Sequence, residues 1–524
     1  MNYNKVMLIS RHHTDVSNPI YNAYIRGIES QCKELIFVDY FDKIWEDGKD
    51  NFEENILNTL EKEEIELVFF IFVSGDATLD PHFIQKVSKN RFIAMVFWDM
   101  EQFFDQIDRY YAQLADLVLL TTNHEYEYKL KLLNINTYCP FSLFDSTKYK
   151  PLQNTLPPID VSFVGEVTKG KRKEYIKYLE DNGINIEAYG VGTKNGKVSF
   201  NKVVEIFNQS KINLSFTGTY ANDIYSFGLN INNHILQNKG KPIEIALCGG
   251  FVLTEYVPSI EKVFPNEDMD TFLTKEELLQ KVQYYLQEEA KRQEMATRAH
   301  EYALIHYDSI NSFEKIFEQI KEIEPKKEKE LYLDNIFVKI HTTFHLFRAI
   351  LFFTNKKYKH MFTELKYLMK GKRVLLKDSY NFVKYMLALW IKGLSFKKDC
   401  NAIFSKLRNR DIVIYGAGIH TSSLLEKFPI LQELNIRAIS DKNEELWGQK
   451  LNNITIISPN EIEKYGNTII ISSFKFENEI SKELQALYKE KVEIINLYNE
   501  KHSIDLTSKY IDAYQIYRET LEAR

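Results

Sequence analysis

The sequence predicts an α/β protein with two tandem Rossmann-like domains, a helical connector and a third, smaller Rossmann-like domain. Short continuous apolar runs alternate with helical stretches, and this alternation stops and restarts twice along the chain. Continuous apolar runs indicate strands buried on both faces, as in a parallel sheet covered by helices. The 524 residues fit about three domains, at roughly 150 residues per domain.

The first two domains are expected over residues 1–145 and 159–323. Strands of the first are predicted in the runs VMLIS, ELIFVDY, ELVFFIFV, RFIAMVFW and DLVLLTT. A turn-rich segment with four prolines, from Pro140 to Pro158, separates it from the second. In the second domain the alternation of apolar runs and helical stretches begins again. Its predicted strands are DVSFVGE, NIEAYG, INLSFTG, FVLTE and a strand near Asp270 to Leu273, and helices from Lys275 to Ile323 complete the domain.

The remaining third of the chain divides into a helical connector (331–407), a small Rossmann-like domain (408–500) and a C-terminal helix (501–524). The connector is rich in Phe, Tyr and Leu and lacks strand signals. From Lys356 to Arg410 it holds fifteen Lys or Arg against three acids. This part could contact an anionic membrane surface peripherally, an acidic partner or phosphate, or it could form a solvated helix face.

Composition excludes several classes of protein. The net charge of -6 argues against general nucleic-acid binding. The four cysteines are scattered without metal-ligand spacing, which predicts a reducing compartment and no zinc site. No signal peptide is evident, so a cytoplasmic location is expected. The most apolar region, Leu331 to Phe353, is broken by polar residues and predicts no transmembrane segment; these are Asp334, Lys339, His341, His345 and Arg348.

The most informative stretch is KGKPIEIALCGGFVLTEYVPSIE, from Lys239 to Glu261. Pro242 suits the first turn of a helix, and Gly249 and Gly250 predict that this helix is short. A strand is expected from Phe251 to Glu255, and a second helix is expected to begin at Ser259, whose hydroxyl could cap it.

This stretch has the chemistry of a sugar-nucleotide pocket. Exposed N–H groups at the helix start, with Lys239 and Lys241, suit a diphosphate. Glu244 could accept hydrogen bonds from two ribose hydroxyls. The alternative is a glutamate favoured by the helix dipole beside solvated lysines.

The span from about Ile159 to Ile320 resembles the C-terminal half of the CgeB-like (spore maturation protein) glycosyltransferases, which have the GT-B fold. The counterparts of the family motifs are Phe163-Val164-Gly165 with Arg172, Lys239-Gly240-Lys241-Pro242-Ile243-Glu244, Cys248-Gly249-Gly250 and Leu253-Thr254-Glu255-Tyr256. Lys241 stands where the family has arginine, which keeps the charge but loses the bidentate fork. Leu236 stands eight positions before Glu244, where many retaining GT-B enzymes have a second glutamate.

The resemblance implies a donor site in the second domain and an acceptor site in the first. Gly165 would let the backbone approach the phosphates, and Arg172 or Lys241 would neutralise the leaving diphosphate. Thr254 and Glu255 would lie at a strand end beside the crevice. No metal and no cofactor are expected, and the nucleotide-sugar is the donor substrate.

The acceptor side offers two candidates for a general base. His12 and His13 follow the first strand, where open α/β sheets place ligands, and the pKa of a histidine suits base catalysis. Asp99 ends RFIAMVFWD and is the rival, with Glu101 next to it. Exposed loop histidines are the alternative for His12 and His13.

Two further patterns carry less weight. In the third domain Gly416 and Gly418 open a helix after a strand and Asp441 ends the next strand, like a dinucleotide fingerprint, although Thr421 replaces the third glycine. This pattern predicts either a second nucleotide site or a docking role. Asp268-Met269-Asp270 matches a metal-binding DxD pattern that occurs easily by chance.

These observations predict a metal-independent glycosyltransferase that moves a sugar from a nucleotide-sugar to a protein, glycan or cell-envelope acceptor. Two alternatives stay open. One is an NAD-dependent nucleotide-sugar oxidoreductase or epimerase centred on Gly416. The other is a non-catalytic binding or scaffold protein with degenerate transferase domains.

Overall fold

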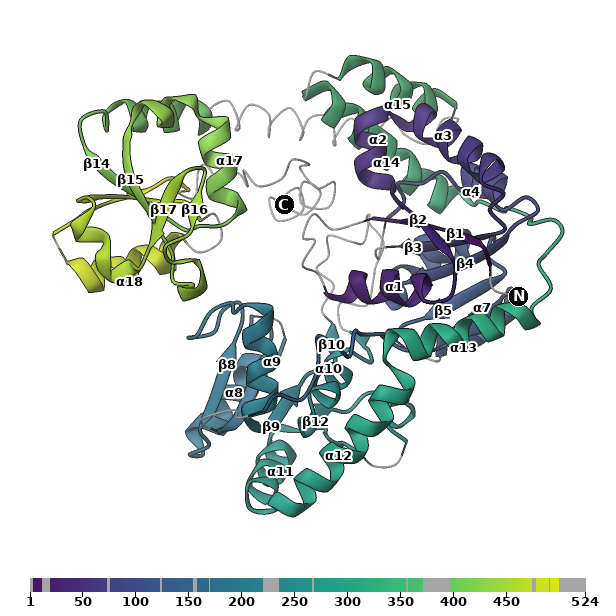
Figure 1. Cartoon of the computed structure of the whole chain (residues 1–524), viewed down its shortest axis with the longest axis horizontal. Helices are drawn as coiled ribbons and strands as arrows, with labels where there is room; N and C mark the ends of the chain where they lie inside the picture. Colours follow the sequence, from purple (N-terminus) through teal and green to yellow (C-terminus); the bar gives the residue numbers. More distant parts are fainter. Residues whose placement is uncertain are drawn as a thin grey trace. The chain divides into compact units, whose positions relative to one another are not determined.

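The chain forms two compact units, Met1–Val374 and Leu375–Arg524, and each is described by itself (Figure 1). The computed structural model describes residues 3–11, 19–72, 76–122, 125–153, 158–168, 170–219, 235–265, 268–354, 357–370, 396–473, 477–489 and 491–498.

The first domain is built on a six-stranded parallel sheet in the order β2-β1-β3-β4-β5-β6. Its strands are β1 (Lys5–Ser10), β2 (Glu34–Asp39), β3 (Leu67–Phe72), β4 (Phe92–Phe97), β5 (Leu117–Leu120) and β6 (Asn136–Tyr138). Every residue of β3, β4 and β5 is buried, which explains why their sequences are continuously apolar. All five predicted strands are present. The sixth, with the sequence NTY, carries no apolar run and is not predicted.

Helices of this domain alternate with the strands. They are α1 (Pro19–Glu29), α2 (Tyr40–Asp47), α3 (Lys49–Lys62), α4 (Pro81–Val87), α5 (Met100–Phe103), the π-helix η1 (Phe104–Asp108), α6 (Arg109–Ala112) and α7 (Glu125–Leu132). Asp39 and Asp80 cap α2 and α4 by accepting hydrogen bonds from backbone N–H groups of the first turn.

The second domain has a five-stranded parallel sheet in the order β13-β12-β9-β7-β8. Its strands are β7 (Ile159–Val164), β8 (Ile186–Tyr189), β9 (Ser210–Ser215), β12 (Val252–Glu255) and β13 (Asp270–Phe272), and a separate antiparallel pair is formed by β10 (Gly218–Thr219) and β11 (Ile235–Leu236). Its helices are α8 (Arg172–Asp181), α9 (Phe200–Gln209), α10 (Lys241–Leu247), the 3₁₀ helix η3 (Ile260–Lys262), α11 (Lys275–Gln287) and α12 (Glu289–His306). All five predicted strands of this sheet are present.

Helix α13 (Ser309–Glu322) belongs by its packing to the first domain, although it follows the second in sequence (Figure 1). Its buried face, Phe313, Ile316, Phe317 and Ile320, joins the core formed by β1, β3, β4 and α1. A Cβ atom at Gly27 in α1 would lie 2.2 Å from the Phe313 ring, so glycine permits the close approach of the two helices. The boundary expected at residue 323 therefore does not separate this helix from the first domain.

The segment predicted as one connector, 331–407, is divided between the two units. Helices α14 (Asn335–Thr354) and α15 (Tyr358–Lys370) pack against each other and against the first domain, with Phe337 and Ile340 in its core (Figure 1). Phe396 and Phe404 instead lie in the core of the second unit. Among the described helices, none combines the length and apolar character needed to cross a bilayer. Residues 371–395 of the basic stretch lie outside the described residues.

The second unit holds a six-stranded sheet in the order β16-β17-β15-β14-β18-β19, parallel except for β16. Its strands are β14 (Asp411–Tyr415), β15 (Asn435–Ser440), β16 (Lys450–Leu451), β17 (Ile454–Ile457), β18 (Thr468–Ile471) and β19 (Glu493–Asn496). Helices are α17 (Ile419–Lys427), α18 (Glu477–Tyr488) and the 3₁₀ helices η4 (Pro429–Glu433), η5 (Glu444–Leu446) and η6 (Pro459–Lys464). The predicted fold class is confirmed. The predicted C-terminal helix, 501–524, lies outside the described residues.

Candidate functional site

Two carboxylates follow strand β4 at the carboxyl edge of the first sheet. Asp99 has a left-handed backbone (φ 53°), and Glu101 lies in the first turn of α5 directly after it. Thr122 follows the neighbouring strand β5, and its hydroxyl donates a hydrogen bond to the Glu101 carboxylate. Open parallel sheets bind ligands at the carboxyl ends of their strands, so this edge is where reacting groups are expected.

The second domain brings three polar residues to this edge, Gln237, Asn238 and Lys239. The Gln237 amide donates hydrogen bonds to Asp99 and, over 3.0 Å, to Glu101. The Asn238 amide donates to the backbone carbonyl that follows β5, over 3.3 Å. Lys239 Nζ lies 2.5 Å from Gln237 Oε1 and 3.6 Å from Asp99 Oδ1. The predicted base Asp99 and the predicted donor-site cation Lys239 therefore meet.

We call Asp99, Glu101, Thr122, Gln237 and Lys239 the Asp99 cluster. Its two carboxylates differ in exposure. The Asp99 side chain is 45% exposed, whereas Glu101 is buried. Burial raises the pKa of Glu101 to about 7, against the opposing hydrogen bond from Thr122. Asp99 is thus the carboxylate that a substrate can reach, and Glu101 helps to hold it in place through Gln237.

Changing Glu101 to Gln is expected to alter the pH dependence of stability. The pKa of Glu101 is raised from 4.5 to about 7 on folding, so the folded protein binds more protons than the unfolded chain between these values. The free energy of unfolding therefore falls as the pH rises through this window, by at most about 3 kcal/mol, at 1.36 kcal/mol per pKa unit. Urea unfolding at about pH 5 and about pH 8 measures this fall in the free energy of unfolding. The fall should be smaller in E101Q than in the wild type, because the variant lacks the Glu101 carboxyl.

The matched control for this measurement is the exposed residue Glu180 on α8. E180Q should keep the wild-type pH dependence. An E101Q protein whose stability declines with pH as steeply as the wild type would contradict the assignment of a buried, neutral-pH titration to Glu101.

Helix α10 begins at Lys241 with Pro242 in its first turn, as predicted. Glu244 is buried, and its Oε2 lies 2.7 Å from Lys241 Nζ. Burial and the neighbouring Glu244 carboxylate raise the pKa of Tyr149 well above its usual value. The carboxylate predicted to accept hydrogen bonds from ribose is therefore already paired with the predicted phosphate cation.

Gly249 and Gly250 lie at the opposite end of α10 from Lys241. Gly249 is left-handed (φ 75°) and follows the last turn. A Cβ atom at Gly250 would lie 2.7 Å from the Asn213 amide and 2.8 Å from the Phe207 carbonyl oxygen. These glycines terminate the helix and allow it to pack closely against the sheet, and the structure does not bring them together with the lysines.

The prediction of a capped helix starting at Ser259 is wrong. Ser259 has a left-handed backbone (φ 68°) and makes no side-chain cap hydrogen bond. Only the single 3₁₀ turn η3 follows. The N-cap residue of a helix needs an extended backbone for its side chain to reach the next N–H groups, and the turn after Pro258 does not provide one.

A second group of charged residues lies at the carboxyl edge of the second sheet. Glu255 is buried and accepts hydrogen bonds from the N–H groups of Thr217 (3.0 Å) and Gly218 (3.3 Å). Lys171 Nζ lies 2.6 Å from the same carboxylate. Burial alone would lower the pKa of Lys171, but the pairing with Glu255 raises it. Thr254 is fully buried beneath this edge.

Arg172 is the first residue of α8 and contacts backbone near the ends of two strands. Its guanidinium donates to the carbonyl oxygens of Glu166 and Gly218, each over 3.0 Å. It therefore joins the loop after β7 to the start of β10. Lys171, which is not among the predicted site residues, is the cation paired with Glu255 at the sheet edge.

Gly165 lies where β7 ends, and its N–H donates to the Tyr189 carbonyl over 2.8 Å. A Cβ atom at Gly165 would lie 2.7 Å from the Phe163 ring. The neighbouring Gly190 has φ 128°, and a Cβ atom there would lie 2.1 Å from the Gly165 carbonyl oxygen. Two glycines are needed for these loops to lie this close at the sheet edge.

The other predicted residues fall into two groups. His12 and His13 lie outside the described residues. Asp268 is buried and pairs with Arg298 over 2.8 Å. Asp270 pairs with Lys281 over 2.9 Å. Both aspartates of the DxD pattern are thus engaged in ion pairs.

The third domain has the predicted strand, glycine turn and helix. Gly416 follows β14 with φ 108°, and α17 begins after Gly418. The Asp441 carboxylate accepts a hydrogen bond from the Ala417 N–H over 2.7 Å, and the Thr421 hydroxyl donates to the Gly416 carbonyl. The acid expected to bind a ribose is therefore bonded to the glycine turn itself.

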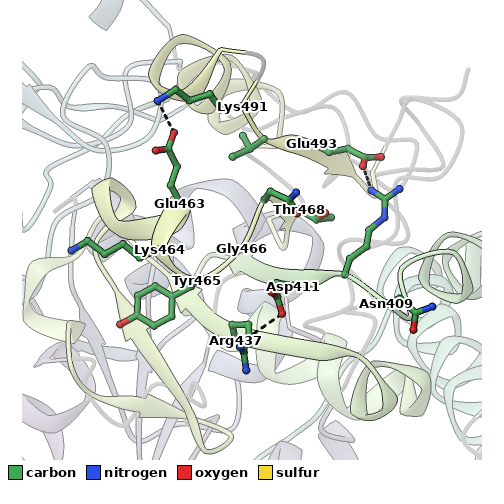
Figure 2. A pocket seen from close by; sticks show the side chains of 13 residues that line it. Asn409, Asp411, Arg437, Glu463, Lys464, Tyr465, Gly466, Thr468, Lys491 and Glu493 are labelled. Carbon is green, nitrogen blue, oxygen red and sulfur yellow. Dashed lines mark hydrogen bonds and ion pairs between the residues drawn. The ribbon is translucent and has the colours of Figure 1, made fainter.

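A cavity of about 1020 Å³ lies at the other edge of this sheet, where β14, β18 and β19 begin (Figure 2). Its charged lining is paired within itself: Arg437 lies 3.3 Å from Asp411, and Lys491 lies 3.2 Å from Glu463. It lies at the amino ends of the strands, opposite the edge that holds the glycine turn. Parallel sheets place ligands at the carboxyl ends, so the fold gives no reason to assign a ligand here.

Two parts of the chain match known families. Residues 155–318 match the family described as glycosyl transferase-like, and residues 408–495 match the family described as C2185-like, N-terminal. No curated protein matches the chain. The first match covers β7 to α13 and includes Lys171, Gln237, Lys239 and Lys241. The second covers the sheet of the third domain.

Solved structures similar to this chain include HepE from Anabaena in complex with UDP and glucose, at 10% identity and a TM-score of 0.43, covering 61% of this chain and 100% of that chain. Sucrose-phosphate synthase from Thermosynechococcus elongatus is similar at 12% identity and a TM-score of 0.43, covering 61% of this chain and 99% of that chain.

The second domain is thus glycosyl transferase-like, and it follows a first Rossmann-like domain. The prediction of a glycosyltransferase is confirmed for this domain. Sequence reasoning did not identify Gln237, Lys171 or the burial of Glu101 as features of the site. For Lys171 the signal was present in the KGKRKE run, where several cations compete for one role.

Proposed function

We propose that the chain transfers a sugar from a nucleotide-sugar to a hydroxyl of a protein, glycan or other cell-envelope acceptor, as a CgeB-like enzyme of the cytoplasm. The observation that carries this proposal is the contact of Gln237 and Lys239, from the glycosyl transferase-like domain, with Asp99 of the first domain. A donor-binding segment and a candidate base then lie at one place.

In this proposal the second domain holds the donor. Lys241, Lys239 and Lys171 face the diphosphate, whose negative charge grows as the bond from the anomeric carbon to the phosphate oxygen breaks. Fixed cations stabilise that charge most where water is excluded. No metal and no cofactor take part in this step. Glu244 accepts hydrogen bonds from ribose once Lys241 turns from it toward the phosphates.

The first domain activates the acceptor. Asp99 accepts the proton of the acceptor hydroxyl as its oxygen bonds to the anomeric carbon. Gln237 and Lys239 orient Asp99 and stabilise its negative charge. Glu101, bonded to the same Gln237 amide, is a positioning residue. His12 or His13 stays the rival base.

The proposal predicts that nucleotide-sugars stabilise the protein. A panel of UDP-, GDP-, CMP- and dTDP-sugars should include one that raises the melting temperature, because binding to the folded state adds about 2.7 kcal/mol at a ligand concentration near 100 Kd. Slow hydrolysis of the same compound should follow without acceptor.

The same panel separates the alternatives. Stabilisation by NAD, but by no nucleotide-sugar, would favour an oxidoreductase centred on Gly416. Stabilisation by a nucleotide-sugar without hydrolysis or transfer to any acceptor would favour a binding protein. The basic stretch after α14, proposed as a peripheral membrane contact, is tested by sedimentation of the full chain with anionic against neutral vesicles.

A further inference from the structure

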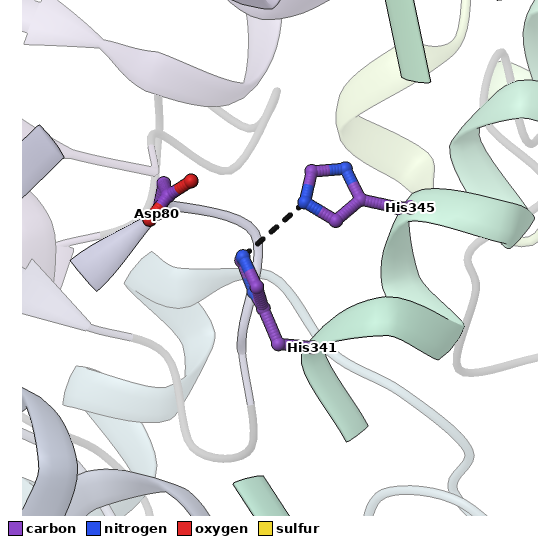
Figure 3. A group of neighbouring side chains, drawn as sticks. All are labelled: Asp80, His341 and His345. Carbon is purple, nitrogen blue, oxygen red and sulfur yellow. Dashed lines mark hydrogen bonds between the residues drawn. The ribbon is translucent and has the colours of Figure 1, made fainter. Parts of the chain in front are cut away.

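His341 and His345 lie one turn apart on α14, and their rings face each other beside Asp80, which precedes α4 (Figure 3). The Nε2 atoms of the two rings are 3.2 Å apart. One atom from each of the three side chains that could bind a metal lies within 4.8 Å of the others. Side chains from two distant parts of the sequence thus converge on one point.

The partner of each Nδ1 atom determines where the ring protons lie. His341 Nδ1 is 2.8 Å from the Ala77 carbonyl oxygen, which can only accept a hydrogen bond. His345 Nδ1 is 2.6 Å from the Glu364 carboxylate, which also accepts. His341 Nδ1 therefore donates its proton, and the Nε2 of this neutral ring offers a lone pair. His345 Nδ1 also lies 3.1 Å from Arg348 Nη2, so its ring proton can lie on Nδ1, facing Glu364, or on Nε2.

Burial lowers the pKa of His345 to about 4 and that of His341 well below its usual value. For Glu364, burial raises the pKa, but the charge of Arg348 and the bond to His345 outweigh it and lower the value to about 2. Without a metal, the two Nε2 atoms at 3.2 Å can share one hydrogen bond, and an ion bound between them would replace its proton.

The geometry fits a tetrahedral metal ion. Zinc–nitrogen bonds of about 2.0–2.1 Å place two nitrogen ligands about 3.3 Å apart, close to the observed separation. The Asp80 oxygen lies within 4.8 Å of the two nitrogens. It therefore needs to move toward them by at most about 1.5 Å to become the third ligand of the ion. A carboxylate and a backbone carbonyl on the far nitrogens are the usual partners of metal-bound histidines.

The surrounding charges leave room for a cation. Lys49 Nζ lies 3.2 Å from Asp80 Oδ2 but also 3.6 Å from Glu53. Arg348 is paired with Glu364 over 3.0 Å. Lys49 and Arg348 thus each have a carboxylate besides Asp80, and a metal ion can take over the Asp80 oxygen from Lys49. His82 Nδ1 lies 3.2 Å from the other Asp80 oxygen, Oδ1.

We propose that Asp80, His341 and His345 bind one divalent transition-metal ion, with Zn²⁺ as the best fit and water in the remaining position. Two imidazoles with one carboxylate favour Zn²⁺ over Mg²⁺, which prefers oxygen ligands. The bound ion joins α14 to the loop before α4 and so fastens the helical pair α14–α15 to the first domain.

The test uses the full chain after treatment with a chelator. Zn²⁺ added alone should bind at about one ion per chain by calorimetry and raise the melting temperature, and Co²⁺ should give the visible absorption of a low-symmetry site. Mg²⁺ should do neither. H341Q leaves the contacts of His345 with Glu364 in place and should weaken Zn²⁺ binding by about 100-fold or more.

His306 on α12 provides the matched control, because it stacks on Tyr302 outside the three-residue group. H306Q should bind Zn²⁺ like the wild type. If H341Q fails to fold, D80N gives the same test, since asparagine keeps the oxygen that caps α4 and loses the charge. Wild-type protein that takes up no Zn²⁺, or a folded variant that binds it as tightly as the wild type, overturns the proposal.

Discussion

Asp99→Asn is expected to lower kcat by about 10²–10⁴-fold, the usual contribution of a general base. The amide keeps the oxygen that accepts the hydrogen bond from Gln237, so the geometry of the Asp99 cluster should persist. What is lost is the ability to take the proton of the acceptor hydroxyl. Steady-state kinetics with saturating donor and acceptor measure the effect.

The control for Asp99 is Asp105, an exposed carboxylate in the π-helix η1 a few residues later. D105N should keep wild-type kcat. A D99N enzyme with wild-type kcat would exclude Asp99 as the base and leave the histidines after the first strand as the candidates.

Lys241→Gln is expected to lower kcat by about 10²–10³-fold, the range found when one group that stabilises a developing anion is removed. Glutamine can still donate a hydrogen bond to the buried Glu244 carboxylate, which would cost about 1–3 kcal/mol if left without a partner. The loss should therefore appear in kcat measured with saturating donor, with a small change in melting temperature.

Lys241→Arg separates charge from packing, because it restores the cation in the form that the resemblance implies. K241R should retain most of the activity. Lys202 on α9 is the control, since it pairs with Glu205 on the same helix turn (2.9 Å). K202Q should behave like the wild type. Equal kcat in K241Q and the wild type would remove Lys241 from the donor site.

Much of the fold follows from local sequence signals. The apolar runs of β3 and β4 are buried on both faces, so burial and sequence pattern coincide there. Helix α10 is also predictable, because Pro242 and Gly249 set its two ends. Strand β6 is not, since NTY has no periodicity that distinguishes it from a loop.

The candidate site was predictable in its parts but not in its pairing. Lys239 and Asp99 are each identified from a strand end or a helix start, yet they lie 140 residues apart in the chain and meet only through domain packing. The Glu101 pKa depends on the depth at which α5 is buried, which no short motif encodes. His341 and His345 have helical spacing in the sequence, but their third partner, Asp80, precedes α4 and lies far from them in the chain.

The sequence by itself determined the order of strands and helices, the three Rossmann-like sheets and the lysine-rich start of α10. These depend on hydrophobic periodicity and on backbone preferences of proline and glycine, which act within a few residues. Tertiary structure alone decided that Asp99 lies beside Lys239, that Glu101 is desolvated and that two imidazoles face Asp80. Electrostatic interactions depend on distance and burial in space, and folding sets both between segments that are remote in the chain.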